Sequence, residues 1–140
     1  MVYDTLITAI QAKLDAVTAV KQVIFGPVTE ITKYPCAIFI PDAFENSFDS
    51  KADNFEIHRF KLWIVCGTSQ KDKTDIFRTV LPTVVDSVKA KFNEEWNLGA
   101  LDGHRIWVVL DTGRWDMSVT ERGVEAWAEM QLTVKLSTEI

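Results

Sequence analysis

Apolar and polar residues alternate along the C-terminal part of the chain, from Val124 to Leu136. Every even position is apolar, and the odd positions are polar or charged except for Trp127. Side chains on a β-strand alternate between two faces, so this period of two predicts one long strand with a buried face and a mostly solvated face. At about 3.3 Å per residue it would extend roughly 43 Å, whereas a usual strand has ~5–6 residues. A strand that outreaches the core of its own domain is typical of a protein that assembles.

Other strands are indicated by compact apolar or alternating runs bounded by Gly and Pro. The expected ranges are 22–25, 36–40, 55–66 and 105–110. Between the second and third of these, residues 41–54 are polar and acidic but carry Phe44 and Phe48, and we expect a projecting loop or an extended hairpin there. Residues 111–123 are expected to form a turn-rich connection, with a possible short strand at 115–119.

Two segments have the 3.6-residue spacing of amphipathic helices. The first is expected to be capped by Asp4. Its apolar face is Leu6, Ile7, Ile10, Leu14 and Val17. The second follows Ser69 and Asp72, which resemble a capping box, and contains Pro82, which should kink it or divide it into two segments. Its apolar face is Ile76, Phe77, Val80, Leu81, Val84, Val85, Val88 and Phe92.

These elements predict one α+β domain over residues 1–140, in two layers. We expect a mainly antiparallel sheet of about four strands with two helices on one face. The opposite face would then carry Trp63, Trp107 and Trp127 in register, one from each of three long strands.

Composition narrows the class of protein. The chain has 140 residues, of which 47% are hydrophobic and 25% charged, an ordinary globular composition. No window approaches the ~18 uninterrupted apolar residues of a membrane helix, and no signal peptide is visible. The formal net charge of −5 argues against binding nucleic acid through its phosphates. Cys36 and Cys66 lie in strand-like apolar runs, so we expect buried free thiols of a reducing cytoplasm.

One triplet suggests catalysis. Asp111-Thr112-Gly113 follows an apolar strand-like run, which is how aspartic proteases present a carboxylate. Those enzymes place a flap and a second active-site turn downstream, but only 27 residues follow Gly113 here and one long strand uses about half of them. The triplet is better interpreted as a strand ending in a polar turn.

No other group indicates an active site. His58 and His104 are far apart and lack local partner ligands, so we expect no metal site, and His58 is interpreted as a solvated or hydrogen-bonded strand residue. No Gly-rich phosphate loop is present, and the sequence suggests no cofactor. We therefore expect a protein that is not an enzyme.

Aromatic residues at expected surface positions indicate contacts with partners. Tryptophan is enriched in interface cores, and contiguous apolar patches are rarely left bare. The two phenylalanines in the acidic stretch 41–54 suggest anchoring, because a solvated loop does not need them. The candidate interface residues are Phe44, Phe48, Trp63, Trp107 and Trp127.

The order of these features resembles the tail terminator (tail completion) proteins of long-tailed bacteriophages. The resemblance covers most of the chain and rests on the order of motifs, none of which is specific alone. The motifs are the N-terminal amphipathic helix, residues 34–39 entered through Pro35, the acidic stretch before residues 54–65, residues 85–88, Leu98-Gly99, the turn 113–115 and the alternation 124–127.

The resemblance implies a homohexameric ring in the virion neck, assembled in the host cytoplasm. Such a ring would cap the head-proximal end of the tail tube, end its polymerisation and present a docking surface to the head–tail connector or head completion protein. Phage DNA would pass through its lumen without specific binding, and no membrane is involved. Two alternatives remain: another neck or minor tail protein of the same fold, or a small-ligand-binding α+β homodimer whose exposed sheet face closes over a pocket.

Overall fold

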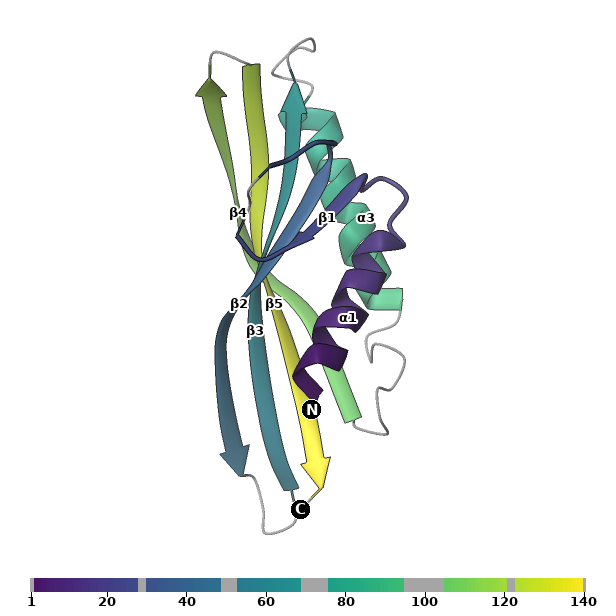
Figure 1. Ribbon diagram of the computed structural model, residues 1–140, viewed down its shortest axis with the longest axis vertical. Helices are drawn as coiled ribbons and strands as arrows, with labels where there is room; N and C mark the ends of the chain where they lie inside the picture. Colours follow the sequence, from purple (N-terminus) through teal and green to yellow (C-terminus); the bar gives the residue numbers. More distant parts are fainter. Residues whose placement is uncertain are drawn as a thin grey trace.

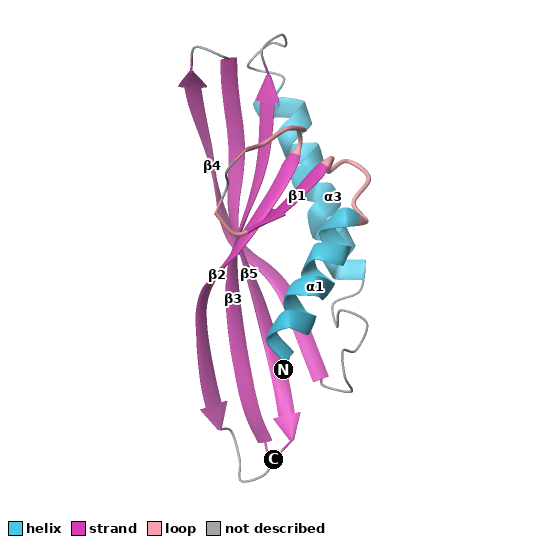
Figure 2. Cartoon of the chain, viewed as in Figure 1, coloured by secondary structure: helices cyan, strands magenta, loops and turns pink. Residues whose placement is uncertain are grey.

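The structure, a computed structural model, describes residues 2–27, 30–48, 53–68, 76–94, 105–120 and 123–139. These residues form one large sheet and a layer of helices (Figures 1 and 2). In chain order the elements are α1 (Val2–Asp15), β1 (Gln22–Phe25), β2 (Cys36–Phe48), β3 (Asp53–Thr68), the π-helix η1 (Ile76–Val80), α3 (Leu81–Glu94), β4 (Arg105–Thr120) and β5 (Gly123–Glu139).

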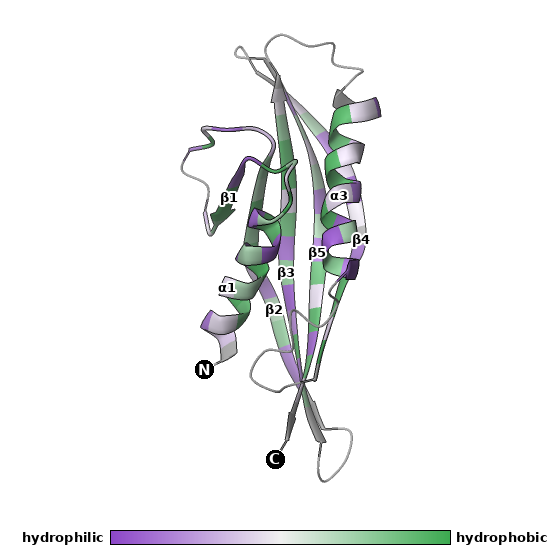
Figure 3. Cartoon of the chain, turned by 90° about the vertical axis from the view of Figure 1, so that its right-hand side faces the viewer, coloured by the Kyte–Doolittle hydropathy of each residue, from purple (hydrophilic) through white to green (hydrophobic). Residues whose placement is uncertain are grey.

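Both α-helices cover the same face of the sheet, which we call the helix face (Figures 1 and 3). We call the opposite side the open face. The main core lies between the helices and the sheet, where alternate residues of the strands meet the apolar faces of α1 and α3. The largest fully buried side chains are Phe39, Phe60, Phe92, Leu6, Ile10, Leu14, Leu62, Ile64, Leu81, Ile106, Leu132 and Leu136.

The sheet is larger than the sequence suggested. The fold is α+β, but the expected count of about four strands was wrong, and the described residues alone form five, in the order β1-β2-β3-β5-β4. The four long strands are antiparallel to their neighbours, whereas the short β1 pairs in parallel with Cys36–Phe39 of β2. The sheet is therefore mixed.

The hairpin of β2 and β3 corrects the expected strand 36–40. Pro41 does not end β2, which continues to Phe48 paired with β3, so the stretch 41–54 contains an extended hairpin. After Phe39, where β1 no longer covers it, β2 is an edge strand. A proline in an edge strand can be accommodated without loss of a hydrogen bond between strands. The pairing passes from Pro41 opposite Phe60 to Ala43 opposite Arg59, which leaves Asp42 as a β-bulge.

β4 corrects the expected connection 111–123. The strand continues from Arg105 to Thr120 with a bulge, since Leu110 pairs with Leu132 and Gly113 with Met130. Two residues of β4 thus face one residue of β5. The turn expected at Asp111-Thr112-Gly113 is instead an irregularity inside one strand.

The two bulges lie within two residues of one level of the sheet. The bulge of β4 lies opposite Gln131, which pairs with Lys61, and the bulge of β2 lies between the partners of Phe60 and Arg59. A bulge bends its strand and increases the local twist, and the long strands cross in the view of Figure 1 because the sheet is strongly twisted. Each bulge also reverses which alternate residues of its strand lie on the helix face.

The helices follow the expected pattern with one difference. α1 begins at Val2, so Asp4 lies in its first turn and does not cap it, and its carbonyl accepts a hydrogen bond from Thr8. The second helical segment is divided as Pro82 predicted, into η1 and α3. The expected capping box at Ser69 and Asp72 lies outside the described residues.

Candidate interaction surface

Trp63 and Trp127 lie together on the open face, partly covered by the chain itself. They pack against a second apolar cluster formed by Cys36, Ile38 and Val65. Ile24 and Ile31, from β1 and the connection that follows it, pack on the same cluster. These tryptophans therefore contribute to packing within the subunit, and the open face is less bare here than the sequence suggested.

Trp107 is separated from this pair. It pairs with Lys135, which in turn pairs with Ile57, whereas Trp63 lies six residues further along β3. At about 3.3 Å per residue, this distance is roughly 20 Å. The expectation of three tryptophans in register was wrong, because the stagger between β4 and β3 cannot be obtained from sequence alone. Trp107 is 37% exposed near the start of the edge strand.

Phe44 is the most exposed large apolar side chain among the described residues, at 78%. The bulge before it places it on the helix face, where it pairs with His58. It lines a groove of about 580 Å³ between the hairpin and the start of α1. We call this the hairpin groove and define it by Tyr3, Pro41, Phe44, His58 and Phe60. Phe48, the other expected anchor, belongs to β2, but its side chain lies outside the described part of the chain.

His58 lines the hairpin groove and is a buried, hydrogen-bonded strand residue, which is the second of its two expected environments. Its Nε2 is 3.3 Å from Oε2 of Glu56, and its ring centroid is 5.9 Å from that of Tyr3. Within the described residues its buried Nδ1 has no hydrogen-bond partner. Burial raises the pKa of Tyr3. The groove is therefore an apolar recess with a polar group in its wall.

A second exposed apolar region lies on β4 beyond its bulge. Trp115 is 54% exposed and Met117 is 44% exposed. They pair with Ala128 and Ala126, so both project on the helix face. The possible short strand expected at 115–119 is confirmed as part of β4, but sequence reasoning did not choose these two residues as surface residues because it placed a turn-rich connection around it. The signal was nevertheless present, since Gly113, Trp115, Met117 and Val119 alternate with Arg114, Asp116 and Ser118.

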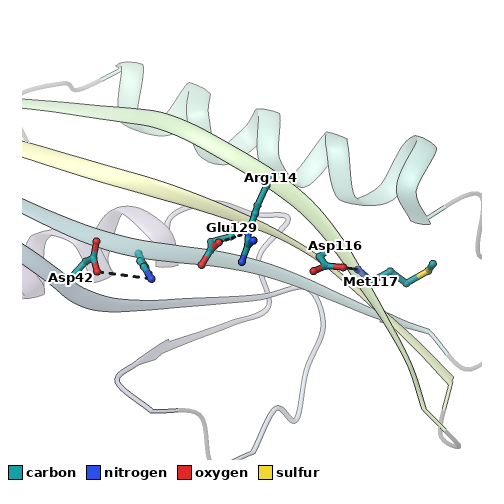
Figure 4. A network of polar contacts seen from close by, with 6 residues as sticks. Asp42, Arg114, Asp116, Met117 and Glu129 are labelled. Carbon is teal, nitrogen blue, oxygen red and sulfur yellow. Dashed lines mark hydrogen bonds and ion pairs between the residues drawn. The ribbon is translucent and has the colours of Figure 1, made fainter.

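Paired charges occupy the open face near the bulges of β2 and β4 (Figure 4). Nε of Arg114 is 2.6 Å from Oε2 of Glu129, and Nζ of Lys61 is 4.0 Å from Oδ1 of Asp42. Further along the hairpin, Glu45 pairs with Arg59 at 2.9 Å. Two of the acids of stretch 41–54, Asp42 and Glu45, thus pair with bases of β3.

The catalytic candidates are not assembled into a site within the described residues. Asp111 is exposed, and its Oδ2 accepts a hydrogen bond from the hydroxyl of Thr133 at 2.6 Å. Cys36 and Cys66 are free and buried, as predicted, and burial raises the pKa of each thiol to about 11. His104 lies outside the described residues.

The described residues contain neither a metal-binding cluster nor a membrane-spanning helix. Within the described ranges, no three His, Cys, Asp or Glu side chains are grouped so that they could bind a metal ion. None of the described helices is long and apolar enough to cross a membrane. Comparison of the sequence with protein-family models and with curated proteins gave no match.

The geometry thus provides two separated apolar surfaces, the hairpin groove and the outer part of β4. Both include stretches of strand whose outer sides are unpaired among the described residues, namely β4 and the part of β2 that follows Phe39. An exposed sheet edge presents a row of backbone donors and acceptors that can pair with another strand. The arrangement can therefore join chains through their edges.

Proposed function

We propose that this chain is a ring-forming structural protein of the tail terminator type, which caps the head-proximal end of a phage tail tube. The observation that carries the proposal is the long outer edge of β4, which exposes Trp107, Val109, Trp115 and Met117. Natural proteins usually protect such an edge with charges, prolines or a covering element. This edge is 16 residues long and exposes these four apolar side chains between charged residues such as Asp111 and Asp116, and exposed apolar side chains on an unpaired edge favour assembly through that strand.

The positions of the two free edges support a ring. They lie at opposite ends of the strand order, on β4 and on the part of β2 beyond β1. A contact between two different surfaces of one chain is head-to-tail, and repeated copies either close into a ring or grow into a filament. Closure gives a fixed number of subunits, which suits a protein that ends a polymer.

The proposed partners are other copies of this chain, the tail tube protein and the head–tail connector. The proposal requires no catalytic residue, metal or cofactor. The open face carries both signs of charge in pairs, which suits a surface that DNA passes without being held. The resemblance described from the sequence suggests six copies, and six chains of 15.9 kDa would weigh about 95 kDa.

Negative-stain microscopy and analytical ultracentrifugation of the full chain test the proposal. The expected result is rings with a central hole and a mass near that of six chains, either alone or after addition of purified tail tubes. Tubes incubated with the protein should stop elongating and carry density at one end only. A chain that stays monomeric and leaves tube growth unchanged would refute the proposal.

The hairpin groove favours a second candidate function, a small-ligand-binding homodimer. Its volume of about 580 Å³ lies within the usual range of ligand pockets, roughly 300–1,000 Å³. Apolar atoms form most of its walls, and the polar residues that line it are Asp42, Asn46, Glu56, His58 and Arg59. This reading predicts a particle near 32 kDa, twice the mass of the 15.9 kDa chain, that is stabilised by an apolar ligand. The same sedimentation experiment separates the two functions.

A further inference from the structure

Two stretches of sheet edge are free in the described part of the chain, and they are of similar length. β1 covers only Cys36–Phe39 of β2, which leaves the nine residues from Ile40 to Phe48 unpaired on their outer side. On β4, the part beyond the bulge runs from Gly113 to Thr120, which is eight residues. Each free edge can therefore satisfy most of the backbone hydrogen bonds of the other.

The strand directions also match. β2 is antiparallel to β3, β3 to β5, and β5 to β4, so β2 and β4 run in opposite directions. A second copy in the same orientation would place its β2 antiparallel beside β4 of the first. The alternating order of the long strands would then continue from one copy to the next.

The exposed side chains select one register for this pairing. Trp115 of β4 and Phe44 of β2 both project on the helix face, and both are more than half exposed. If these two residues face each other, the antiparallel ladder places Arg114 opposite Glu45 on the open face. Opposite charges then face each other on one side of the new ladder, and aromatic rings on the other.

This register places the regular part of the ladder beyond β1. From Trp115 opposite Phe44, Gly113 lies opposite Asn46 and Asp116 opposite Ala43, and the bulge at Asp42 interrupts the ladder before residues 36–39, which β1 covers. Without a stagger, residues 113–116 of β4 would lie level with residues 36–39 of β2, whose outer side β1 already covers. The offset is six residues, because Trp115 is level with Ile64 and Phe44 with His58. A stagger of this kind is needed when a sheet closes with tilted strands.

We infer that the outer edge of β4 around Trp115 pairs antiparallel with the part of β2 around Phe44 in a second copy, with Gly113 opposite Asn46 and Asp116 opposite Ala43. Trp115 of one copy then packs against Phe44 at the hairpin groove of the next. The inference deepens the proposed function and rests on it for the ring. It assigns the groove to a side chain of the same protein, which removes the most exposed aromatic residues from water.

Paired cysteines test the register directly. In the proposed ladder Asp116 faces Ala43 of the next copy, so the double variant Asp116→Cys, Ala43→Cys should give a ladder of covalent oligomers with a short bis-maleimide at pH 7. The matched control is Val109→Cys, Ala43→Cys, because Val109 is level with Ala43 in the unstaggered arrangement. Cys36 and Cys66 should not interfere, since both are buried.

A pair of tryptophan variants tests the contact itself. Trp115→Ala should weaken self-association at least about tenfold, as expected for an aromatic anchor, while the unfolding curve of the monomer is unchanged. Trp107→Ala is the matched control, because it removes an exposed tryptophan from the same strand outside the proposed ladder. It should change self-association less than about threefold.

The outcomes separate this inference from the proposed function. At about 1 mM protein, where even a weak contact is populated, absence of the 116–43 crosslink would overturn the inference. So would an equal or higher yield from the 109–43 pair. Rings that cap tubes without the 116–43 crosslink would leave the function standing and refute the contact. Crosslinked rings that do not cap tubes would support the contact and refute the proposed function.

Discussion

Tyr34 is held against the open face by Glu125, whose Oε2 accepts a hydrogen bond from the tyrosine hydroxyl at 2.6 Å. The tyrosine belongs to the connection between β1 and β2, and Glu125 belongs to β5 at the far side of β3. The ring lies over Gly67 of β3, where a Cβ atom would come within 2.8 Å of it. The bond thus fastens the connection whose Ile31 packs on the cluster with Trp63 and Trp127.

We predict that stability falls at high pH through Tyr34. Burial, followed by the hydrogen bond and the charge of Glu125, raises the pKa of Tyr34 from 10.0 to about 12. The unfolded chain therefore loses this proton first, so the contribution is complete below pH 10 and is lost as the pH rises toward 12. Chemical unfolding followed at pH 9 and pH 11 should show the decrease.

The control for this prediction is Tyr34→Phe, which keeps the ring over Gly67 and removes the hydroxyl. It should abolish the part of the pH dependence that lies between pH 10 and 12. Ultraviolet titration of tyrosinate should also lose its highest step. A native Tyr34 that ionises near pH 10 would contradict the geometry of the bond.

The thiols give a second pH prediction. Burial raises the pKa of both Cys36 and Cys66 from 9.0 to about 11, so the folded chain retains their protons longer than the unfolded chain. Their contribution to stability is present below pH 9 and is lost as the pH rises toward 11. At pH 8 a thiol-specific chromogenic reagent should react only as fast as the chain opens. Rapid labelling of either thiol under native conditions would show that the clusters around it are accessible.

The bulge of β4 gives a third prediction. A Cβ atom on Gly113 would lie 3.0 Å from the carbonyl oxygen of Glu129 and 3.1 Å from Cγ of Met130. Because the first of these atoms is backbone, Gly113→Ala should lower the free energy of unfolding by about 1–3 kcal/mol, as overpacking usually does. Denaturant unfolding should be compared with that of Ser118→Ala, which adds no volume to the same strand. Equal stability of the two variants would show that β4 and β5 can move apart at Gly113 without loss of stability.

Much of the fold could be predicted from periodicity. The alternation from Val124 to Leu136 predicted β5, and the helical spacing predicted the buried faces of both helices. What failed were the bulged strands. At Asp42 and at Asp111-Thr112 the alternation changes phase, so each long strand looked like a short strand followed by a loop or turn. A phase change is a local event of one residue, and sequence periodicity alone does not distinguish it from the end of a strand.

The candidate surface was only partly predictable for the same reason. Phe44 and Trp107 were chosen because they are aromatic in polar surroundings, and both are exposed. Trp63 and Trp127 were placed on the correct face, but whether they are covered depends on the path of the connection after β1, a contact between distant parts of the chain. Trp115 was missed because its strand was interpreted as a connection.

These placements change what is expected of Trp127. Its packing against Cys36, Ile38 and Val65 means that truncation removes contacts within the subunit. Truncation of a fully buried tryptophan to alanine lowers the free energy of unfolding by about 3–5 kcal/mol. Because Trp127 is only partly buried, we expect Trp127→Ala to lower it by about 2 kcal/mol. Trp107→Ala, at an exposed position, should cost less than about 0.5 kcal/mol. Urea unfolding of both variants at one protein concentration measures the difference, and size-exclusion chromatography checks that their oligomeric states are equal. If Trp127→Ala were as stable as Trp107→Ala but failed to assemble, the open face around Trp127 would be a subunit contact and not part of the monomer core.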